Sequence, residues 1–198
     1  TANGKRTKPC CARSRVFLQT NAKFCAMMEK TREECKVFRE MRRNKQLLAE
    51  DVSREILKKN TSGVLSLMGD EGYPYGVPLS YVLVEDKIFF HCAKTGHKID
   101  AIRSCEKASF CVIDQDKIVS EEYTTYFRSV IAFGRVHILE SDEEKMHAIR
   151  ILATKYSGDQ GAEGIDKEIG KHFANLCMIQ FDIEHLTGKE AIELVRMR

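Results

Sequence analysis

The sequence predicts a mainly β, mixed α+β fold, with about six antiparallel strands in a closed or nearly closed β-barrel that carries peripheral helices. Short runs of alternating apolar residues follow one another, with hairpin-like turns between them. Helical patterns interrupt these runs only at intervals, so the strands do not alternate regularly with crossover helices. No G-x-G-x-x-G motif follows the first strand, and the pattern therefore excludes a Rossmann-type domain.

The first half of the domain pattern predicts one helix and three antiparallel strands. Apolar residues at helical spacing among charges predict a helix over Leu47–Asn60. Three strands follow, over Val64–Met68, Tyr75–Glu85 and Ile88–Cys92. Pro78 lies within the second of them, and proline has no backbone N–H to donate to a neighbouring strand. We therefore expect part of this strand to lie at a sheet edge or at a bulge.

The second half of the pattern predicts three helices and three further strands. The helices are expected over Gly96–Ser104, Ser141–Tyr156 and Ile165–Asn175, and the strands over Ala108–Asp114, Thr124–Leu139 and Leu176–Glu184. Ser141 with Glu144 forms a capping-box pattern at the start of its helix. Gly134 allows a bend or bulge, a glycine-rich loop is expected over Ser157–Gly164, and Thr187–Lys189 leads into the terminal tail.

Length and charge divide the chain into a basic leader and one domain. Residues 1–28 carry six basic side chains and no acidic one, whereas the whole chain of 198 residues has a net charge of only +3. We expect residues 1–37 to be a basic N-terminal extension, disordered or non-native, and residues 38–198 to form the domain. A targeting segment or a nucleic-acid arm is the less favoured interpretation of the leader.

Composition also limits where the protein is expected to be located and what it is expected to bind. No apolar run approaches the roughly 20 residues that a membrane span needs, and no secretory h-region lies near the N-terminus. The nearly balanced net charge of +3 gives no argument for nucleic acid. We therefore expect a cytoplasmic protein that binds neither membranes nor nucleic acid.

The eight cysteines have no repeated C-x-x-C pair and no Cys/His spacing that suits zinc. In a chain without an export signal we expect reduced thiols and no metal site. Cys105, Cys111 and Cys177 have the pattern of small core residues. We expect Cys92 to pack in the same way rather than to take part in redox chemistry.

The turn Cys92–Lys98 carries the clearest chemical signal in the sequence. A strand ends here in a cationic turn that contains glycine, and a helix pattern begins directly after it. Unpaired backbone N–H groups and the helix dipole both favour an anion at such a place. The Lys98 ammonium and the N–H groups of Thr95 and Gly96 suit a phosphate, so the turn predicts a phosphorylated cofactor. Lys98 taken by itself is equally compatible with a solvated helix end.

Several motifs resemble, in order, the pyridoxamine 5′-phosphate oxidase-like family, and within it the branch of the 5-nitroimidazole-resistance flavoproteins. The motifs are Gly72–Tyr81, Lys87–Asp100, Tyr123–Val130 with Gly134–Arg135, and His185–Ala191. The resemblance extends from about Phe38 to Val195 and leaves the basic leader unexplained.

The resemblance implies an FMN-binding split barrel of six antiparallel strands that forms a homodimer, with FMN in two clefts between the subunits. Main-chain groups of the strand Val77–Tyr81 are expected to meet the polar edge of the flavin ring, and the basic pair His97 and Lys98 to bind the phosphate. Arg128 and Ser129 are expected near the cofactor or at the dimer seam. The implied cofactor-binding set is Val77, Pro78, Leu79, Ser80, Tyr81, His91, Cys92, Ala93, Thr95, Gly96, His97, Lys98, Arg128 and Ser129.

His91 is the implied catalytic residue, because the histidine of this motif lies near the flavin in the branch resembled. Imidazole titrates near neutral pH, so His91 is suited to donate a proton to a reduced substrate or to stabilise charge on the ring. A structural role is an equally weighted alternative for a lone histidine on a strand.

The resemblance implies an FMN-dependent oxidoreductase that reduces a small aromatic or nitro-containing substrate. The alternative is a flavin- or haem-handling binding protein of the same fold without turnover of its own. The arginine and histidine groups with which pyridoxamine phosphate oxidases hold the substrate phosphate have no counterpart in Lys171–Arg198. Vitamin B6 oxidation is therefore not expected.

Overall fold

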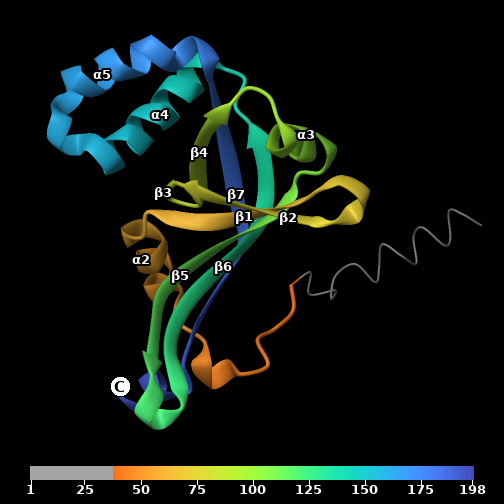
Figure 1. Cartoon of the computed structure of the whole chain (residues 1–198), viewed down its shortest axis with the longest axis vertical. Coiled ribbons are helices and arrows are strands. Elements are labelled where there is room, and N and C mark those ends of the chain that lie inside the picture. Colours follow the sequence, from red (N-terminus) through yellow and green to blue (C-terminus); the bar gives the residue numbers. More distant parts are fainter. Residues whose placement is uncertain (1–37) are drawn as a thin grey trace, which may run out of the picture. The chain divides into compact units, whose positions relative to one another are not determined.

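One antiparallel sheet of seven strands organises the described part of the chain, residues 38–198 of a computed structural model (Figure 1). Its strands are β1 (Ser62–Met68), β2 (Pro74–Ser80), β3 (Val82–Val84), β4 (Lys87–Ala93), β5 (Lys107–Val119), β6 (Thr124–Ile138) and β7 (Leu176–Glu190). Their order across the sheet is β2-β1-β5-β6-β7-β4-β3. The expected basic extension over residues 1–37 lies outside the described residues.

The sheet has seven strands rather than the six expected, because the predicted strand Tyr75–Glu85 is divided at Tyr81. Its first part, β2, pairs with β1, and its second part, β3, pairs with β4. These two strands form the opposite edges of the sheet, although a single residue separates them along the chain. No ladder joins β2 to β3 within residues 38–198, so strand pairing does not complete the expected closure of the barrel.

The hydroxyl of Tyr156 in α4 (Asp142–Ser157) supports the backbone at this break. The Tyr81 N–H donates to the Tyr156 hydroxyl oxygen over 2.9 Å. The same hydroxyl lies 2.9 Å from the Tyr81 carbonyl oxygen, and it also lies beside the Thr61 carbonyl. The Tyr81 ring is fully buried, and its own hydroxyl donates to the Leu57 carbonyl over 2.7 Å. Tyr156 thus takes the place of the missing strand neighbour, because buried backbone groups need hydrogen-bond partners.

Five α-helices accompany the sheet in the described residues. Besides α4 they are α2 (Glu50–Lys59), α3 (His97–Ser104), α5 (Gly161–His172) and α6 (Ile192–Arg196), with 3-10 helices at Asn44–Gln46, Asp70–Gly72, Ser120–Glu122, Gly158–Gln160 and Phe173–Asn175. Ser141 caps α4 as expected, since its side chain accepts hydrogen bonds from the N–H groups of Glu143 and Glu144. No helix in this part of the chain is long and apolar enough to cross a membrane.

The prediction of a loop over Ser157–Gly164 is wrong, because α5 already begins at Gly161 and a 3-10 turn precedes it. Ile165 and Ile169 lie four residues apart on one face of α5 and are buried against the α4 side of the sheet. This tertiary packing outweighs the weak helix propensity of the glycines in the first turn.

Two apolar cores lie on the opposite faces of β4 and β7. The larger core includes Phe90, Phe110 and Phe181, which are fully buried on the inner face of the curved sheet. The smaller core lies between the sheet and the α4–α5 pair and includes Phe89 and Met178. Because adjacent strand residues point to opposite faces, Phe89 and Phe90 fill different cores and β4 is buried on both sides.

Two glycines allow close approaches between elements. Gly134 lies at the register shift between β6 and β7, where an added Cβ would overlap the Asp182 carbonyl oxygen, and the expected bulge is confirmed. Gly188 lies under α2, where an added Cβ would overlap the Ser53 hydroxyl oxygen. Thr187–Lys189 is therefore not a lead into a tail: it is part of β7, which continues along β6 while α2 packs on it.

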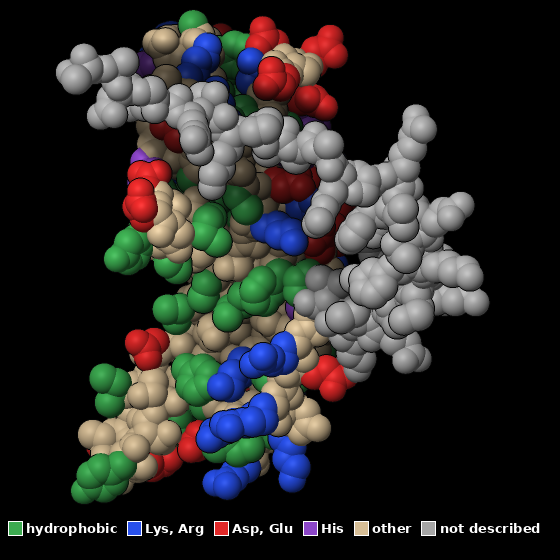
Figure 2. All heavy atoms as spheres, turned by 90° about the vertical axis from the view of Figure 1, so that its right-hand side faces the viewer, with side chains coloured by type: hydrophobic (Ala, Val, Ile, Leu, Met, Phe, Trp, Pro, Cys, Tyr) green, Lys and Arg blue, Asp and Glu red, His purple; other side chains and the backbone are tan. Residues whose placement is uncertain are grey.

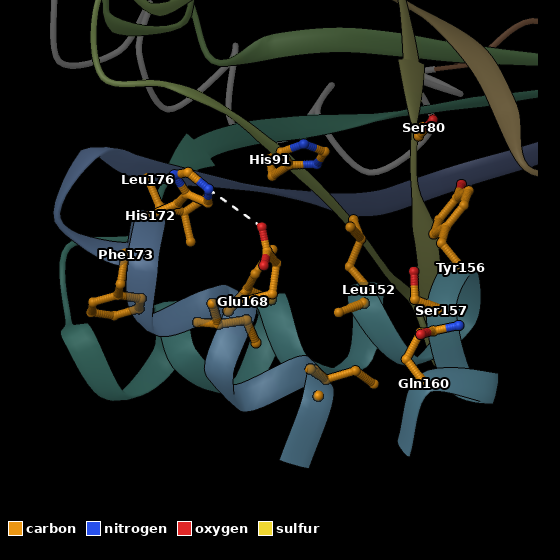
Figure 3. A pocket seen from close by; sticks show the side chains of 15 residues that line it. Ser80, His91, Leu152, Tyr156, Ser157, Gln160, Glu168, His172, Phe173 and Leu176 are labelled. Carbon is orange, nitrogen blue, oxygen red and sulfur yellow. Dashed lines mark ion pairs between the residues drawn. The ribbon is translucent and has the colours of Figure 1, made fainter. Parts of the chain in front are cut away.

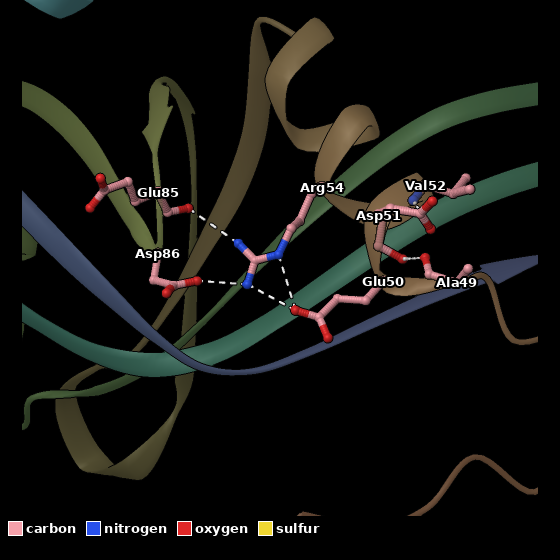
Figure 4. A network of polar contacts seen from close by, with 8 residues as sticks. Ala49, Glu50, Asp51, Val52, Arg54, Glu85 and Asp86 are labelled. Atoms are coloured by element: carbon pink, nitrogen blue, oxygen red, sulfur yellow. Dashed lines mark hydrogen bonds and ion pairs between the residues drawn. The ribbon is translucent and has the colours of Figure 1, made fainter.

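A charged network ties α2 to the turn between β3 and β4 (Figure 4). Arg54 in α2 donates through Nη2 to Asp86 over 2.6 Å and to Glu50 over 2.9 Å. Its Nη1 donates to the Glu85 carbonyl over 3.2 Å, at a residue with a φ of +54°. The network therefore holds this left-handed turn, and with it the short edge strand β3, against α2.

Replacing Tyr156 with Phe is expected to lower the free energy of unfolding by about 1–2 kcal/mol, because the Tyr81 backbone loses its partner while the ring remains. Urea denaturation followed by circular dichroism measures the change. Tyr123→Phe is the matched control, since Tyr123 is 97% exposed. Equal stability of the two variants would show that the Tyr156 hydroxyl does not support the break in the sheet.

Candidate functional site

The turn between β4 and α3 has the geometry of an anion-binding site. Gly96 adopts a φ of +121°, which favours glycine, and an added Cβ there would meet open space. No side chain within residues 38–198 caps α3, and the Gly96 carbonyl oxygen accepts hydrogen bonds from the N–H groups of Ile99 and Asp100. The N–H groups of His97 and Lys98 precede the first helical hydrogen bond and point toward the helix start, a position that favours an anion.

Lys98 lies half-buried beside a pair of cysteines. Cys92 and Cys177 are directly opposite each other in the β4–β7 ladder. Burial raises the pKa of the Cys92 thiol well above its usual range, the Lys98 charge offsets part of this rise, and Cys177 adds to it. The Cys92 thiol is therefore protonated at neutral pH and does not neutralise the charge of Lys98.

His97 connects the turn to the hairpin between β1 and β2. Its ring stacks on Tyr75, with the ring centroids 4.1 Å apart and an interplanar angle of 20°. Its Nε2 lies 3.5 Å from a carboxylate oxygen of Asp70. The turn that carries Lys98 is therefore fixed beside the first half of β2, the strand expected to lie along the cofactor.

Strand β2 presents its residues alternately to the core and to solvent. Val77 and Leu79 are half-buried, whereas Pro78 and Ser80 are exposed. The strand is an edge of the sheet, which confirms the position expected for Pro78. Tyr81 differs from these four residues because its ring lies in the core, so its side chain has no contact to offer a ligand.

A cavity of about 650 Å³ lies between the strand ends and the α4–α5 pair (Figure 3). Ser80 of β2 and His91 of β4 line it on the strand side, and Leu152 and Tyr156 line it from α4. Figure 3 shows the His91 ring at the strand wall, with Gln160 on the opposite, helical side. The structure thus brings two residues of the predicted set, Ser80 and His91, into one cavity.

The helical wall of this cavity was not expected from the sequence. Ile149, Ile165 and Ile169 form its apolar surface. Nε2 of His172 lies 3.4 Å from a carboxylate oxygen of Glu168 at its lining. Apolar spacing within the two helices predicts that each has a core-facing side. Only the tertiary arrangement shows that these sides leave a space between them.

Arg128 and Ser129 lie far from the turn within one chain. Arg128 pairs with Glu190 at the end of β7, whereas Ala93 of the turn pairs with Leu176 at its beginning. The two ends of this strand are roughly 45 Å apart along the chain direction. One chain therefore does not bring these two residues to the turn between β4 and α3.

Arg128 holds a buried carboxylate instead. Its Nε donates to Oε2 of Glu190 over 3.1 Å, and Glu190 has no exposed surface. Arg198 approaches the other carboxylate oxygen to 2.5 Å in a geometry that makes an ion pair but no hydrogen bond. Gln46 donates to the Glu190 carbonyl over 2.9 Å. These contacts give Arg128 a structural role at the end of β7.

Cations gather close to the turn rather than around the large cavity. A second cavity of about 170 Å³ is lined by Lys94, Arg103 and Lys145, together with Glu140. Lys145 is paired with Asp142 over 2.5 Å, so part of this positive charge is balanced. In the described range 38–198, no group of three or more His, Cys, Asp or Glu side chains is placed to hold a metal ion.

A curled antiparallel sheet with an anion-binding turn beside one edge strand and an apolar cavity near it defines a ligand-binding class of small β-protein. A family model described as pyridoxamine 5′-phosphate oxidase matches residues 49–190, well over half of the chain. The chain therefore belongs to this family, whose members bind flavins. No curated protein sequence matches the chain.

Several solved structures share this fold. A candidate 5-nitroimidazole antibiotic resistance protein from Bacteroides thetaiotaomicron has a TM-score of 0.61 at 21% identity, over 73% of this chain and 86% of its own. A flavocytochrome from Azotobacter vinelandii has a TM-score of 0.63 at 15% identity, over 79% and 74% of the two chains. An FAD and haem binding protein from Mycobacterium smegmatis has a TM-score of 0.61 at 18% identity, over 74% and 73%. At these identities the likeness shows the fold alone.

Replacing Arg128 with Gln is expected to lower the free energy of unfolding by about 1–3 kcal/mol, because the buried Glu190 carboxylate loses its hydrogen-bonded cation. Urea denaturation at neutral pH measures the loss. Arg135→Gln is the control, since Arg135 pairs with the exposed Glu106 and Glu184 and solvent screens those charges. A loss for the Arg128 variant no larger than for the control would contradict the structural role.

Proposed function

We propose that this chain is an FMN-binding flavoprotein of the nitroimidazole-resistance branch, and an oxidoreductase that acts on a small aromatic or nitro-containing substrate. The observation that carries the proposal is the uncapped turn at Gly96, with Lys98 beside it, in a chain whose family binds flavins. The stacking of His97 on Tyr75 supports it, because this contact places the turn next to β2.

In this proposal the phosphate of FMN binds at the start of α3. The backbone N–H groups of the first turn provide directional hydrogen bonds, and the Lys98 ammonium neutralises charge. Thr95 and Gly96 are exposed, and a Cβ added at Gly96 would meet no atom within 4 Å. The protonated Cys92 thiol adds no negative charge to oppose the phosphate.

The flavin ring is proposed to lie along the exposed edge of β2, where Pro78 leaves no N–H and a ligand can take the place of a strand neighbour. Bound FMN supplies the electron transfer of the reaction. His91 reaches the same region from β4, and its imidazole donates a proton to the reduced substrate in the cavity.

A homodimer completes the proposed site. Arg128 and Ser129 lie far from the turn in one chain, so their expected approach to the cofactor requires a second subunit. The outer face of the sheet supports such a contact. Val64, Cys111 and Ile131 are paired across β1, β5 and β6 in one outward row, and two of them are exposed at 39% and 38%. Figure 2 shows hydrophobic side chains on the surface of the described part.

Purified protein is expected to be yellow, with a flavin absorbance spectrum and FMN as the released ligand. Lys98→Ala is expected to weaken FMN binding about tenfold or more, because one charge-assisted phosphate contact is lost. Fluorescence titration of the apoprotein with FMN measures the change. Lys87→Ala, at the other end of β4, is the matched control and should bind FMN as the unchanged protein does.

Colourless protein that cannot be reconstituted with FMN would refute the flavin proposal. Anaerobic mixing of the reduced protein with a nitroaromatic acceptor then separates an oxidoreductase from a carrier. An oxidoreductase is reoxidised faster with the acceptor than without it. Equal rates would favour the second candidate, a flavin- or haem-handling binding protein, which the fold likeness to a flavocytochrome and to an FAD and haem binding protein supports.

Replacing Ile131 with Glu is expected to dissociate the proposed dimer, with the dissociation constant rising on the order of a hundredfold, because two-fold symmetry buries the new charge twice. Sedimentation velocity measures the assembly state. Val52→Glu is the control, since Val52 is exposed at 37%, close to the 38% of Ile131, but lies on α2. A dimer that survives Ile131→Glu would place the interface on another surface.

A further inference from the structure

We propose that the cavity between α4, α5 and the strand ends binds an uncharged, flat and largely apolar molecule, and that this molecule is the substrate of the proposed flavin site. Its volume of about 650 Å³ lies within the usual range of small-molecule pockets. The assignment of the ligand class stands on the cavity itself. Its identification as the substrate site rests on the proposed flavin function.

The walls of the cavity are apolar on the helical side. Leu152, Ile165 and Ile169 supply branched side chains from α4 and α5, and Phe173 supplies an aromatic ring at one end. Such a surface gains free energy when a flat apolar ligand displaces water from it. It therefore selects for apolar area rather than for a charged group.

The strand side supplies hydrogen-bonding groups without charge partners. The Ser80 hydroxyl and the His91 ring line the cavity, and neither has a hydrogen bond or ion pair to another side chain of the described residues. The Tyr156 hydroxyl, in contrast, is already engaged by the Tyr81 backbone. A ligand therefore meets Ser80 and His91 as its polar contacts, on the side that faces β2.

The charges around the cavity disfavour an anionic ligand. None of the described residues that line it is Lys or Arg, and Glu168 is its one lining carboxylate. Lys171 donates to Glu168 over 2.5 Å and lowers the pKa of Glu168, so the carboxylate is ionised and already paired. A phosphorylated ligand would find no Lys or Arg among the described residues here, whereas Lys98 and Lys94 offer cations at the turn after β4. The chain thus separates an anion site from an uncharged one.

Two ring-matched probes test the ligand class: naphthalene methanol, which is uncharged, and naphthyl phosphate. Isothermal titration of the protein as purified is expected to give a dissociation constant at least about tenfold lower for the alcohol. Gly164→Leu is expected to weaken binding of the alcohol about tenfold, because Gly164 lines the cavity and the new side chain would occupy part of it. The fold is expected to tolerate this change, since an added Cβ meets only Gln160, at an ordinary 3.5 Å. Gly170→Leu, on the same helix and away from the cavity, should change the affinity less than about twofold.

Ala153→Phe fills the cavity from α4 and keeps the test independent of α5, with Thr154→Phe as its exposed neighbour control. The proposal is overturned if naphthyl phosphate binds as tightly as the alcohol, or if neither filling variant weakens the alcohol. It is also overturned if FMN competes with the alcohol, since the cavity then holds the cofactor. Colourless protein that binds the alcohol as expected would refute the flavin function and leave the ligand class standing. Yellow protein that does not bind the alcohol would refute the ligand class and leave the flavin function standing.

Discussion

The structure depends on how the chain passes from one edge of its sheet to the other at Tyr81. Strands β2 and β3 are consecutive, yet β2 pairs with β1 at one edge and β3 with β4 at the other. The backbone at this crossing has no strand neighbour, and the Tyr156 hydroxyl supplies the missing donor and acceptor. Because the two edges are one residue apart at this point, Ser80 of β2 and His91 of β4 come to line the same cavity.

The same crossing links the fold to the two candidate ligand sites. Tyr156 supports the break with its hydroxyl and lines the cavity with its ring. Near the start of β2, at the opposite end of the strand from Ser80, Tyr75 stacks on His97 and fixes the turn between β4 and α3 against the strand. The edge strand β2 therefore lies between a site suited to phosphate and a site suited to an apolar molecule. In the proposed function the flavin phosphate binds at the turn, the ring lies along the edge of β2, and the cavity is left for the substrate.

The far end of the sheet has a different character. Arg128, Arg198 and Gln46 surround the buried Glu190, where a charged group without partners would be costly. This cluster fastens the end of β7 to the start of the domain and to α6. Membership of the pyridoxamine 5′-phosphate oxidase family accounts for the fold and for flavin binding in the family. In the proposed function the choice of substrate depends on the cavity formed by the helices, which has no Lys or Arg among the described residues that line it.

The sequence by itself determined the features that depend on neighbouring residues. The helix before β1, the Ser141 cap, the edge position of Pro78 and the bulge at Gly134 follow from local spacing, capping and the lack of an N–H or a Cβ. The cationic turn at Gly96 also follows, because a strand, a glycine and a helix start occur in order. The expectation that the protein binds a flavin came from the family motifs.

Only the tertiary structure decided the features that depend on distant partners. The alternation of Tyr75–Glu85 continues through Tyr81, so nothing local marks the change of partner from β1 to β4. Thr187–Lys189 has the composition of a turn, yet pairing with β6 and packing under α2 keep it in β7. The cavity is likewise absent from any local pattern. Apolar periodicity shows which side of α4 and α5 is buried, but the space between two such sides is set by how whole elements pack.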